Sequence, residues 1–167
     1  ALLWSSPQSL RVTNFCVDNN RAFLAAGSFG RDLWVLDVSD PTSPVTISVT
    51  PNLWAHEVND FVKDGDLLYC ANFTDVAIID VSDPASPSQV AAWSGRDRVH
   101  DLDISNGYAF AADSTIAVLD VADPAHPALA GRYSVALQSD RIDVDNGLAC
   151  VVNGYGLQIF DVADPAH

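Results

Sequence analysis

Short apolar runs recur along the chain, and each leads into the same polar turn. The first run, Leu33–Leu36, continues into Asp37-Val38-Ser39-Asp40-Pro41, and a second proline follows three residues later. Equivalent segments begin at Val76, Ile116 and Leu157, with leading aspartates spaced by 43, 40 and 41 residues. A regular period of this size indicates a repeat protein. The repeats are placed at residues 9–50, 51–93, 94–133 and 134–167, with residues 1–5 added to the last.

Each unit contains a first strand, a tight turn, a second strand, a hairpin of variable length and then the apolar run as a third strand. The tight turns, such as Ser105-Asn106-Gly107, have the Asn and Gly residues that two-residue hairpins require. The first strands are Val12–Val17, Val58–Lys63, Val99–Ile104 and Ser139–Val144. The second strands are Ala22–Ala26, Leu68–Asn72, Ala109–Asp113 and Ala149–Asn153. A short fourth strand is expected after the second proline, at Val45–Thr50, Ser88–Trp93 and Ala128–Tyr133. Helical periodicity is absent, so the fold is predicted to be all-β.

The third strands are apolar on both faces, whereas a strand with one wet face would alternate. Each sheet is therefore expected to be covered on both sides, as happens when four-stranded blades are arranged around an axis in a β-propeller. The first residues, Ala1–Trp4, align with a fourth strand, and the last unit lacks one. We therefore expect Ala1–Trp4 to complete the last blade and hide both sheet edges.

The repeated apolar strand followed by Asp-Val-Ser-Asp-Pro-x-x-Pro resembles the LVIVD repeat of bacterial and archaeal cell-surface and secreted proteins. The resemblance covers all four units, although unit 2 has Lys63 where the others have Val17, Ile104 and Val144, which suggests a looser unit. It implies a β-propeller. Because members often have more units, four blades would form a four-bladed ring, half of an eight-bladed ring made by two chains, or a fragment of a longer ring.

Charge and composition narrow the possible partners. The chain has 22 acidic and 8 basic residues, a formal charge of −14, which disfavours binding to nucleic acid or anionic lipid. All of the acids except Glu57 are Asp, a residue suited to turns. No apolar run approaches the ~20 residues that cross a bilayer. The three cysteines, Cys16, Cys70 and Cys150, lie in strand patterns and are expected to be buried thiols.

Two groups of residues are candidates for a binding site, both on the face where connections vary in length. Insertions confined to one face of a repeat array often mark its binding face. The first group lies at the start of the first strands, at the mouth of the central channel: Asn59, Asp60, His100, Asp101, Asp140 and Arg141, beside Thr13 and Asn14. These polar groups could hold a small polar ligand or a cation, or they could simply line a water-filled channel.

The second group is Trp54, His56 and Glu57, in a long connection between units. An exposed tryptophan there would be a contact for a partner or a sugar, and otherwise it would cap the core. Asn72-Phe73-Thr74 matches the N-glycosylation triplet. No cofactor is expected; calcium is conceivable from the carboxylates, but no loop has a known calcium-binding spacing.

No catalytic motif is present, so the chain is predicted to be a non-enzymatic binding or scaffolding module of a secreted or cell-surface protein. Its partner would be a protein or a surface, with self-association also open. One alternative is a metal-dependent hydrolase or lactonase that uses Asp60, His100, Asp101 and Asp140 at the channel mouth. Another is a structural subunit of a larger extracellular assembly.

Overall fold

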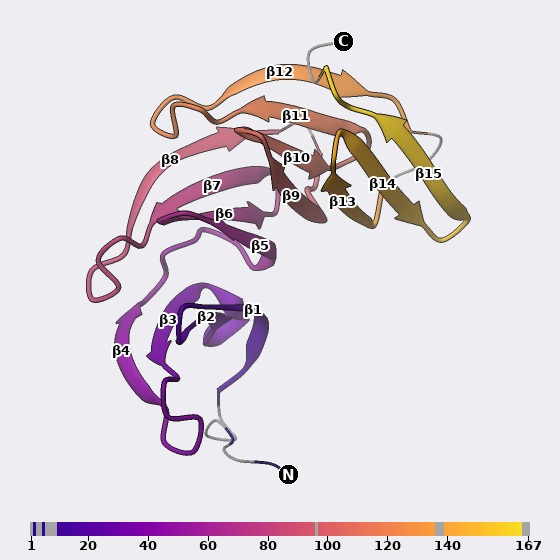
Figure 1. The fold of residues 1–167 in the computed structure, drawn as a ribbon. Helices are drawn as coiled ribbons and strands as arrows, with labels where there is room; N and C mark the ends of the chain where they lie inside the picture. The colour runs from indigo at the N-terminus through magenta and orange to yellow at the C-terminus, as the bar shows by residue number, and fades with distance from the viewer. Residues whose placement is uncertain (1, 3–4, 6–9, 96, 136–138, 165–167) are drawn as a thin grey trace.

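The computed structural model describes residues 2, 5, 10–95, 97–135 and 139–164, and it confirms the all-β prediction. The strands form four antiparallel sheets, and within each sheet they are adjacent in chain order (Figure 1). Blade 1 contains β1 (Val12–Asp18), β2 (Arg21–Ala26), β3 (Asp32–Asp37) and β4 (Val45–Thr50). Blade 2 contains β5 (Val58–Asp64), β6 (Leu67–Asn72), β7 (Asp75–Asp80) and β8 (Ser88–Ser94). Blade 3 contains β9 (Asp101–Ser105), β10 (Tyr108–Ala112), β11 (Ile116–Asp120) and β12 (Ala128–Tyr133). Blade 4 contains, among the described residues, β13 (Arg141–Asp145), β14 (Leu148–Asn153) and β15 (Gly156–Asp161).

The recurring turns have the chemistry that the sequence predicts. Asn106 and Gly107, between β9 and β10, both have positive φ, at 52° and 79°, as a tight hairpin with right-handed twist requires. Both aspartates of the Asp-Val-Ser-Asp-Pro turn cap backbone N–H groups two residues on: Asp37 accepts from Ser39 at 2.8 Å and Asp40 from Thr42 at 2.9 Å. The same pair of bonds recurs in units 2 and 3. The aspartates of the repeat are therefore structural.

Apolar cores fill the spaces between successive blades. Phe23 and Val35 of blade 1 pack with Phe61 and Leu68 of blade 2, and comparable clusters join blade 2 to blade 3 and blade 3 to blade 4. The first strand of each blade is the innermost, since β5 lies against both β1 and β9, and β13 lies against β9. The blades therefore radiate from a common axis, as in a β-propeller.

The four blades form an open arc, with blade 1 and blade 4 at its two ends (Figure 1). The prediction that third strands are dry on both faces is confirmed for β7 and β11, whose four central residues are all buried. It is wrong for β15, where no described strand covers one face of blade 4 and Leu157 and Ile159 are exposed. The predicted closing strand Ala1–Trp4 lies outside the described residues except for Leu2, which is exposed and in no strand.

Trp54 decides between the two alternatives that the sequence left open, and it does not fit the predicted binding role. It is 1% exposed and belongs to the core between blades 1 and 2, so it is not a surface contact for a partner. The backbone places it there: Trp54 donates its N–H to the Arg31 carbonyl at 3.4 Å and accepts from Arg31 Nε at 3.2 Å. The connection between the blades is thus fixed by its own largest side chain.

Replacing Trp54 by Ala should lower the free energy of unfolding by about 3–5 kcal/mol, because it leaves a large cavity between two blades. Trp54→Phe is the matched control. It keeps an aromatic ring in the core, so it should cost only about 1 kcal/mol. Urea denaturation measures both. Equal losses for the two variants would contradict the placement of Trp54 in the core.

Candidate functional site

The polar residues predicted at the channel mouth lie on the inner strands, where they connect one blade to the next. Asn14 Nδ2 donates to Asp60 Oδ1 at 2.6 Å, across blades 1 and 2. Arg141 Nη1 donates to Asp101 Oδ1 at 3.0 Å, and the Ile142 N–H donates to Asp101 Oδ2 at 2.7 Å, across blades 3 and 4. Asn14, Asp60, Asp101 and Arg141 thus form a row along the inner side of the arc, which we call the channel row.

The other three residues of this group are arranged differently. Asn59 Nδ2 donates to the Val99 carbonyl at 2.7 Å, and Asn59 Oδ1 accepts from Arg98 Nη2 at 2.7 Å. His100 is half-buried, with its backbone N–H bonded to Ala112, and Asp140 is exposed. No group of three His, Cys, Asp or Glu side chains in the described part of the chain is arranged to hold a metal ion.

Asp60 is the most perturbed carboxyl of the channel row. Burial raises its pKa to about 6, and the neighbouring Asp101 carboxylate contributes in the same direction. The Asp60 carboxyl therefore loses its proton at a higher pH than an ordinary aspartate does.

A groove lies at the ends of blades 1 and 2 on the face with variable connections. Its cavity volume is about 320 Å³. Its lining residues come from the hairpins between second and third strands and from the connections between blades: Phe29, Arg31, Ala55, His56, Glu57, Phe73 and Arg98. We call it the aromatic groove.

Two phenylalanines at hairpin tips shape the aromatic groove. Phe29 and Phe73 are exposed, and both have positive φ, at 65° and 57°. This conformation is unusual for a bulky residue and is strained, which is typical of functional positions. The Phe73 ring packs against the His56 ring at a tilt of 37°, with centroids 5.0 Å apart, and the Arg98 guanidinium lies 5.7 Å from the centre of the Phe73 ring.

The charge of the aromatic groove is opposite to that of the chain. Arg31 and Arg98 hydrogen-bond neutral acceptors, Trp54 O and Asn59 Oδ1. The carboxylate of Glu57 is paired with Arg11 at 2.8 Å. The groove is therefore locally basic within a strongly acidic protein.

Sequence reasoning identified His56 and Glu57 of this groove and missed Phe29, Arg31, Phe73 and Arg98. The sequence feature that could have indicated these residues is an aromatic side chain, Phe29 or Phe73, in each of two hairpins that differ in length. Asn72, in the predicted glycosylation triplet, is buried.

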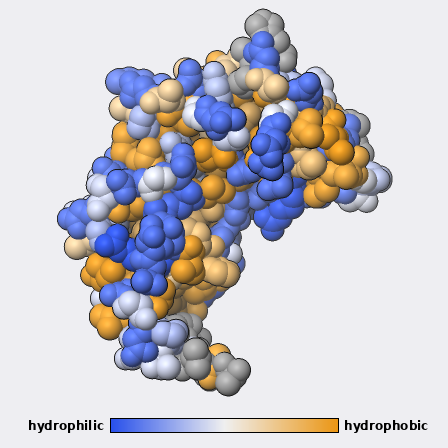
Figure 2. Space-filling view, in the orientation of Figure 1, coloured by the Kyte–Doolittle hydropathy of each residue, from blue (hydrophilic) through white to orange (hydrophobic). Residues whose placement is uncertain are grey.

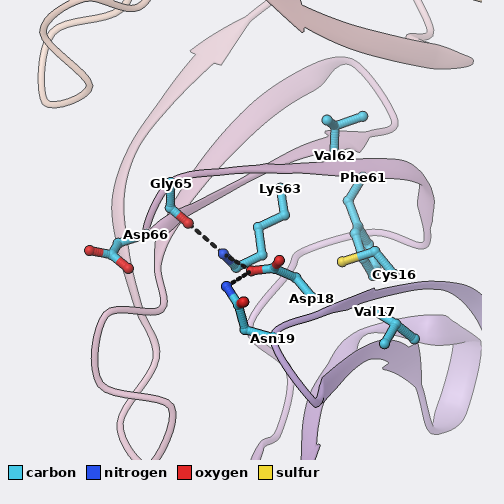
Figure 3. Close-up of a pocket in the computed structure, with 9 residues that line it drawn as sticks. All are labelled: Cys16, Val17, Asp18, Asn19, Phe61, Val62, Lys63, Gly65 and Asp66. Atoms are coloured by element: carbon cyan, nitrogen blue, oxygen red, sulfur yellow. Dashed lines mark hydrogen bonds and ion pairs between the residues drawn. The ribbon is translucent and has the colours of Figure 1, made fainter.

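A larger hollow, of about 650 Å³, lies at the opposite ends of β1 and β5 (Figure 3). Lys63 projects into it, donates to Asp18 Oδ2 at 2.7 Å and also to the Gly65 carbonyl. Lys63 thus bridges blades 1 and 2 and holds the pKa of Asp18 below its usual range. Cys16, on the wall of the hollow, has its pKa raised to about 11 by burial, so its thiol stays protonated and unreactive at neutral pH.

The raised pKa of Asp60 predicts a pH-dependent stability. A carboxyl whose pKa is higher in the folded state stabilises the fold fully below its ordinary value of 3.8, and this contribution is lost as pH rises through about 6. Asp60→Asn keeps the acceptor for Asn14 and removes the charge. The variant should exceed the wild type by about 1–2 kcal/mol at pH 8, a value reduced for partial solvent exposure, and the gain should vanish towards pH 4.

Urea denaturation of both proteins from pH 4 to pH 8 measures this difference. Asp140→Asn, which removes an exposed carboxylate from the same face, should not reproduce the gain. A constant difference between Asp60→Asn and the wild type over this range would show that Asp60 is not perturbed.

Comparisons with known proteins agree with this architecture. The model of the LVIVD repeat matches residues 17–49, 58–93 and 97–135. A search of curated proteins finds no significant match. Among solved structures, the computationally designed Ika4 protein aligns with a TM-score of 0.74 and 11% identity, over 95% of this chain and 94% of that one. The computationally designed Ika8 protein aligns with a TM-score of 0.71 and 11% identity, over 93% of this chain and 47% of that one. Likeness at this identity shows a shared fold only.

Proposed function

The chain belongs to the LVIVD-repeat family, and from this premise we propose that it is a non-enzymatic module that binds a protein partner through the aromatic groove. The observation that carries the proposal is the combination of two exposed phenylalanine rings with two arginines in one concave surface. Aromatic and Arg side chains dominate the energetics of protein interfaces.

The chemistry of the groove favours an acidic segment that also carries an apolar or aromatic side chain. Arg31 and Arg98 would bind carboxylates, because among the described residues neither has an Asp or Glu oxygen within 4 Å as an ion-pair partner. Phe29 and Phe73 would receive the apolar side chain. The acidic remainder of the chain would repel the same segment elsewhere, so that charge alone confines binding to the groove.

The hydrogen bonding of the channel row supports a scaffold rather than a catalyst at the channel mouth. The carboxylates of the channel row, which an enzyme at the channel mouth would use, accept hydrogen bonds from Asn14, Arg141 and backbone N–H groups. In this proposal the module acts in a secreted or cell-surface protein, following its resemblance to proteins of that kind. No helix in the described part of the chain is long and apolar enough to cross a bilayer.

Selection of random peptides displayed on phage against the immobilised chain tests the proposal. We expect enrichment of peptides that combine Asp or Glu with an aromatic residue. Arg98→Ala should lower the affinity for a selected synthetic peptide by about 10-fold, because it removes both a cation and a contact with Phe73.

Arg21→Ala is the matched control, since Arg21 is an exposed arginine of blade 1 that does not line the groove. Fluorescence anisotropy of the labelled peptide compares the two variants. If both variants lower the affinity for the peptide equally, the aromatic groove is not the binding site. The same conclusion follows if selection enriches no peptides that combine an acidic residue with an aromatic one.

A further inference from the structure

Each end of the arc leaves one apolar sheet face without a neighbouring blade. We call the face of a blade towards the next blade in chain order its front face, and the opposite one its rear face. The rear face of blade 1 and the front face of blade 4 stand at the opening of the arc (Figure 1). The following inference concerns these two faces and does not depend on the aromatic groove.

The rear face of blade 1 has residues that the repeat elsewhere buries. Phe15 in β1 is 65% exposed, whereas its equivalents Phe61, Leu102 and Ile142 are 4%, 1% and 6% exposed. Those three pack against the preceding blade. Val17, on the same face of β1, is 61% exposed. Blade 1 thus has the apolar surface that receives a preceding blade.

The front face of blade 4 shows the complementary pattern. Leu157 and Ile159 in β15 are 59% and 61% exposed. Their equivalents in the three preceding blades are all 0% exposed: Leu33, Val35, Val76, Ile78, Ile116 and Val118. Hydrophobic side chains gather at the β14–β15 end of the arc (Figure 2). A buried Leu or Ile contributes about 1.5–3 kcal/mol relative to an exposed one, so these positions are suited to a following blade.

We propose that a second copy of this chain covers both faces, so that two arcs close head to tail into one ring of eight blades. Within the chain, a front face packs on a rear face at each of three joints. The front face of blade 4 in one copy and the rear face of blade 1 in the other would pack in the same way. Two copies related by a two-fold axis form this joint twice, so that each of the four end faces has a neighbouring blade.

One hydrogen bond between the inner strands of blades 3 and 4 has a matching donor and acceptor at the proposed joint. Between blades 3 and 4, the Val144 N–H donates to Asp103 Oδ2 at 2.6 Å. Asp143 has the position of Asp103 in blade 4, and Val17 has the position of Val144 in blade 1. The Val17 N–H points away from β2, because Asp18 and Arg21 are the hydrogen-bonded pair that closes the hairpin. Asp143 of one copy is therefore matched to the backbone of Val17 in the other.

A single copy does not satisfy its own ends, since Phe15 and Ile159 both remain exposed. An arc of this curvature can be followed by further blades, because the chain aligns with 47% of a longer designed protein. The charge of −14 on each copy opposes association, so added salt should strengthen the dimer by screening this repulsion.

Sedimentation velocity and light scattering of the full chain, from about 1 to about 100 µM, test the proposal. We expect a species of twice the chain mass of 17.8 kDa, and a lower dissociation constant at higher salt. A monomer at every concentration would overturn the proposal and assign the open faces to another occupant. An open series of larger oligomers would overturn the closed ring.

Leu157→Asp should raise the dissociation constant of the dimer by about 10- to 100-fold, because it places a charge in both joints. The residue is already exposed in one copy, so the fold should tolerate the change, which circular dichroism checks. Leu129→Asp is the matched control: Leu129 is exposed in β12 of blade 3, which has a blade on each side. Equal effects of the two changes would overturn the proposed interface.

A mixing experiment tests the head-to-tail arrangement. Phe15→Asp alters the rear face of blade 1, and Leu157→Asp alters the front face of blade 4. In a mixed dimer one joint carries both changes and the other joint carries neither. The mixture should therefore associate more tightly than either variant alone. If the mixture has a dissociation constant no lower than that of either variant alone, the head-to-tail joint is overturned.

Discussion

The structure depends on the burial of sheet faces between successive blades. A four-stranded sheet with two apolar faces gains most when it lies between two others, and blades 2 and 3 show this state. In each interior joint, side chains from the second and third strands of one blade pack on the first, second and third strands of the next. The hydrogen bonds within a sheet fix the register, while the joints between sheets supply the core.

Much of this architecture could be predicted, because it is encoded locally and repeatedly. The Asp37 and Asp40 carboxylates accept hydrogen bonds from backbone N–H groups of their own turns. The motif therefore marks the end of a strand through local interactions alone. The Val-Ile-rich third strands indicated sheets covered on both sides. The sequence left open a four-bladed ring, half of an eight-bladed ring and a fragment of a longer ring. It could not decide among them, since Leu157 and Ile159 look like their buried equivalents and only their neighbours in space differ.

The candidate site was harder to predict for a related reason. Trp54 and Phe73 are both large aromatics in connections, yet one is in the core and the other is exposed. The difference comes from the backbone: Trp54 is held inward by hydrogen bonds with Arg31, whereas Phe73 has a left-handed conformation at a hairpin tip. Side-chain type alone does not distinguish these two situations. The role of Lys63 was also not evident from its residue type: the charge that suggested a looser unit 2 pairs with Asp18 of blade 1.

The channel row shows how the chain limits repulsion between carboxylates of neighbouring inner strands. If each inner strand had an aspartate at the third position, four carboxylates would stand side by side on the inner side of the arc. The chain instead has Asn14 and Arg141 at the two ends and carboxyl groups only at Asp60 and Asp101. Each carboxyl then has one neutral or cationic side-chain donor, and the unfavourable contact is reduced to a single pair, which adds to the effect of burial in raising the pKa of Asp60. The ends of the row are also compatible with each other: where Arg141 of one arc meets Asn14 of another, no carboxylates are brought together, so the electrostatics of the inner strands allow the same closure that the apolar faces favour.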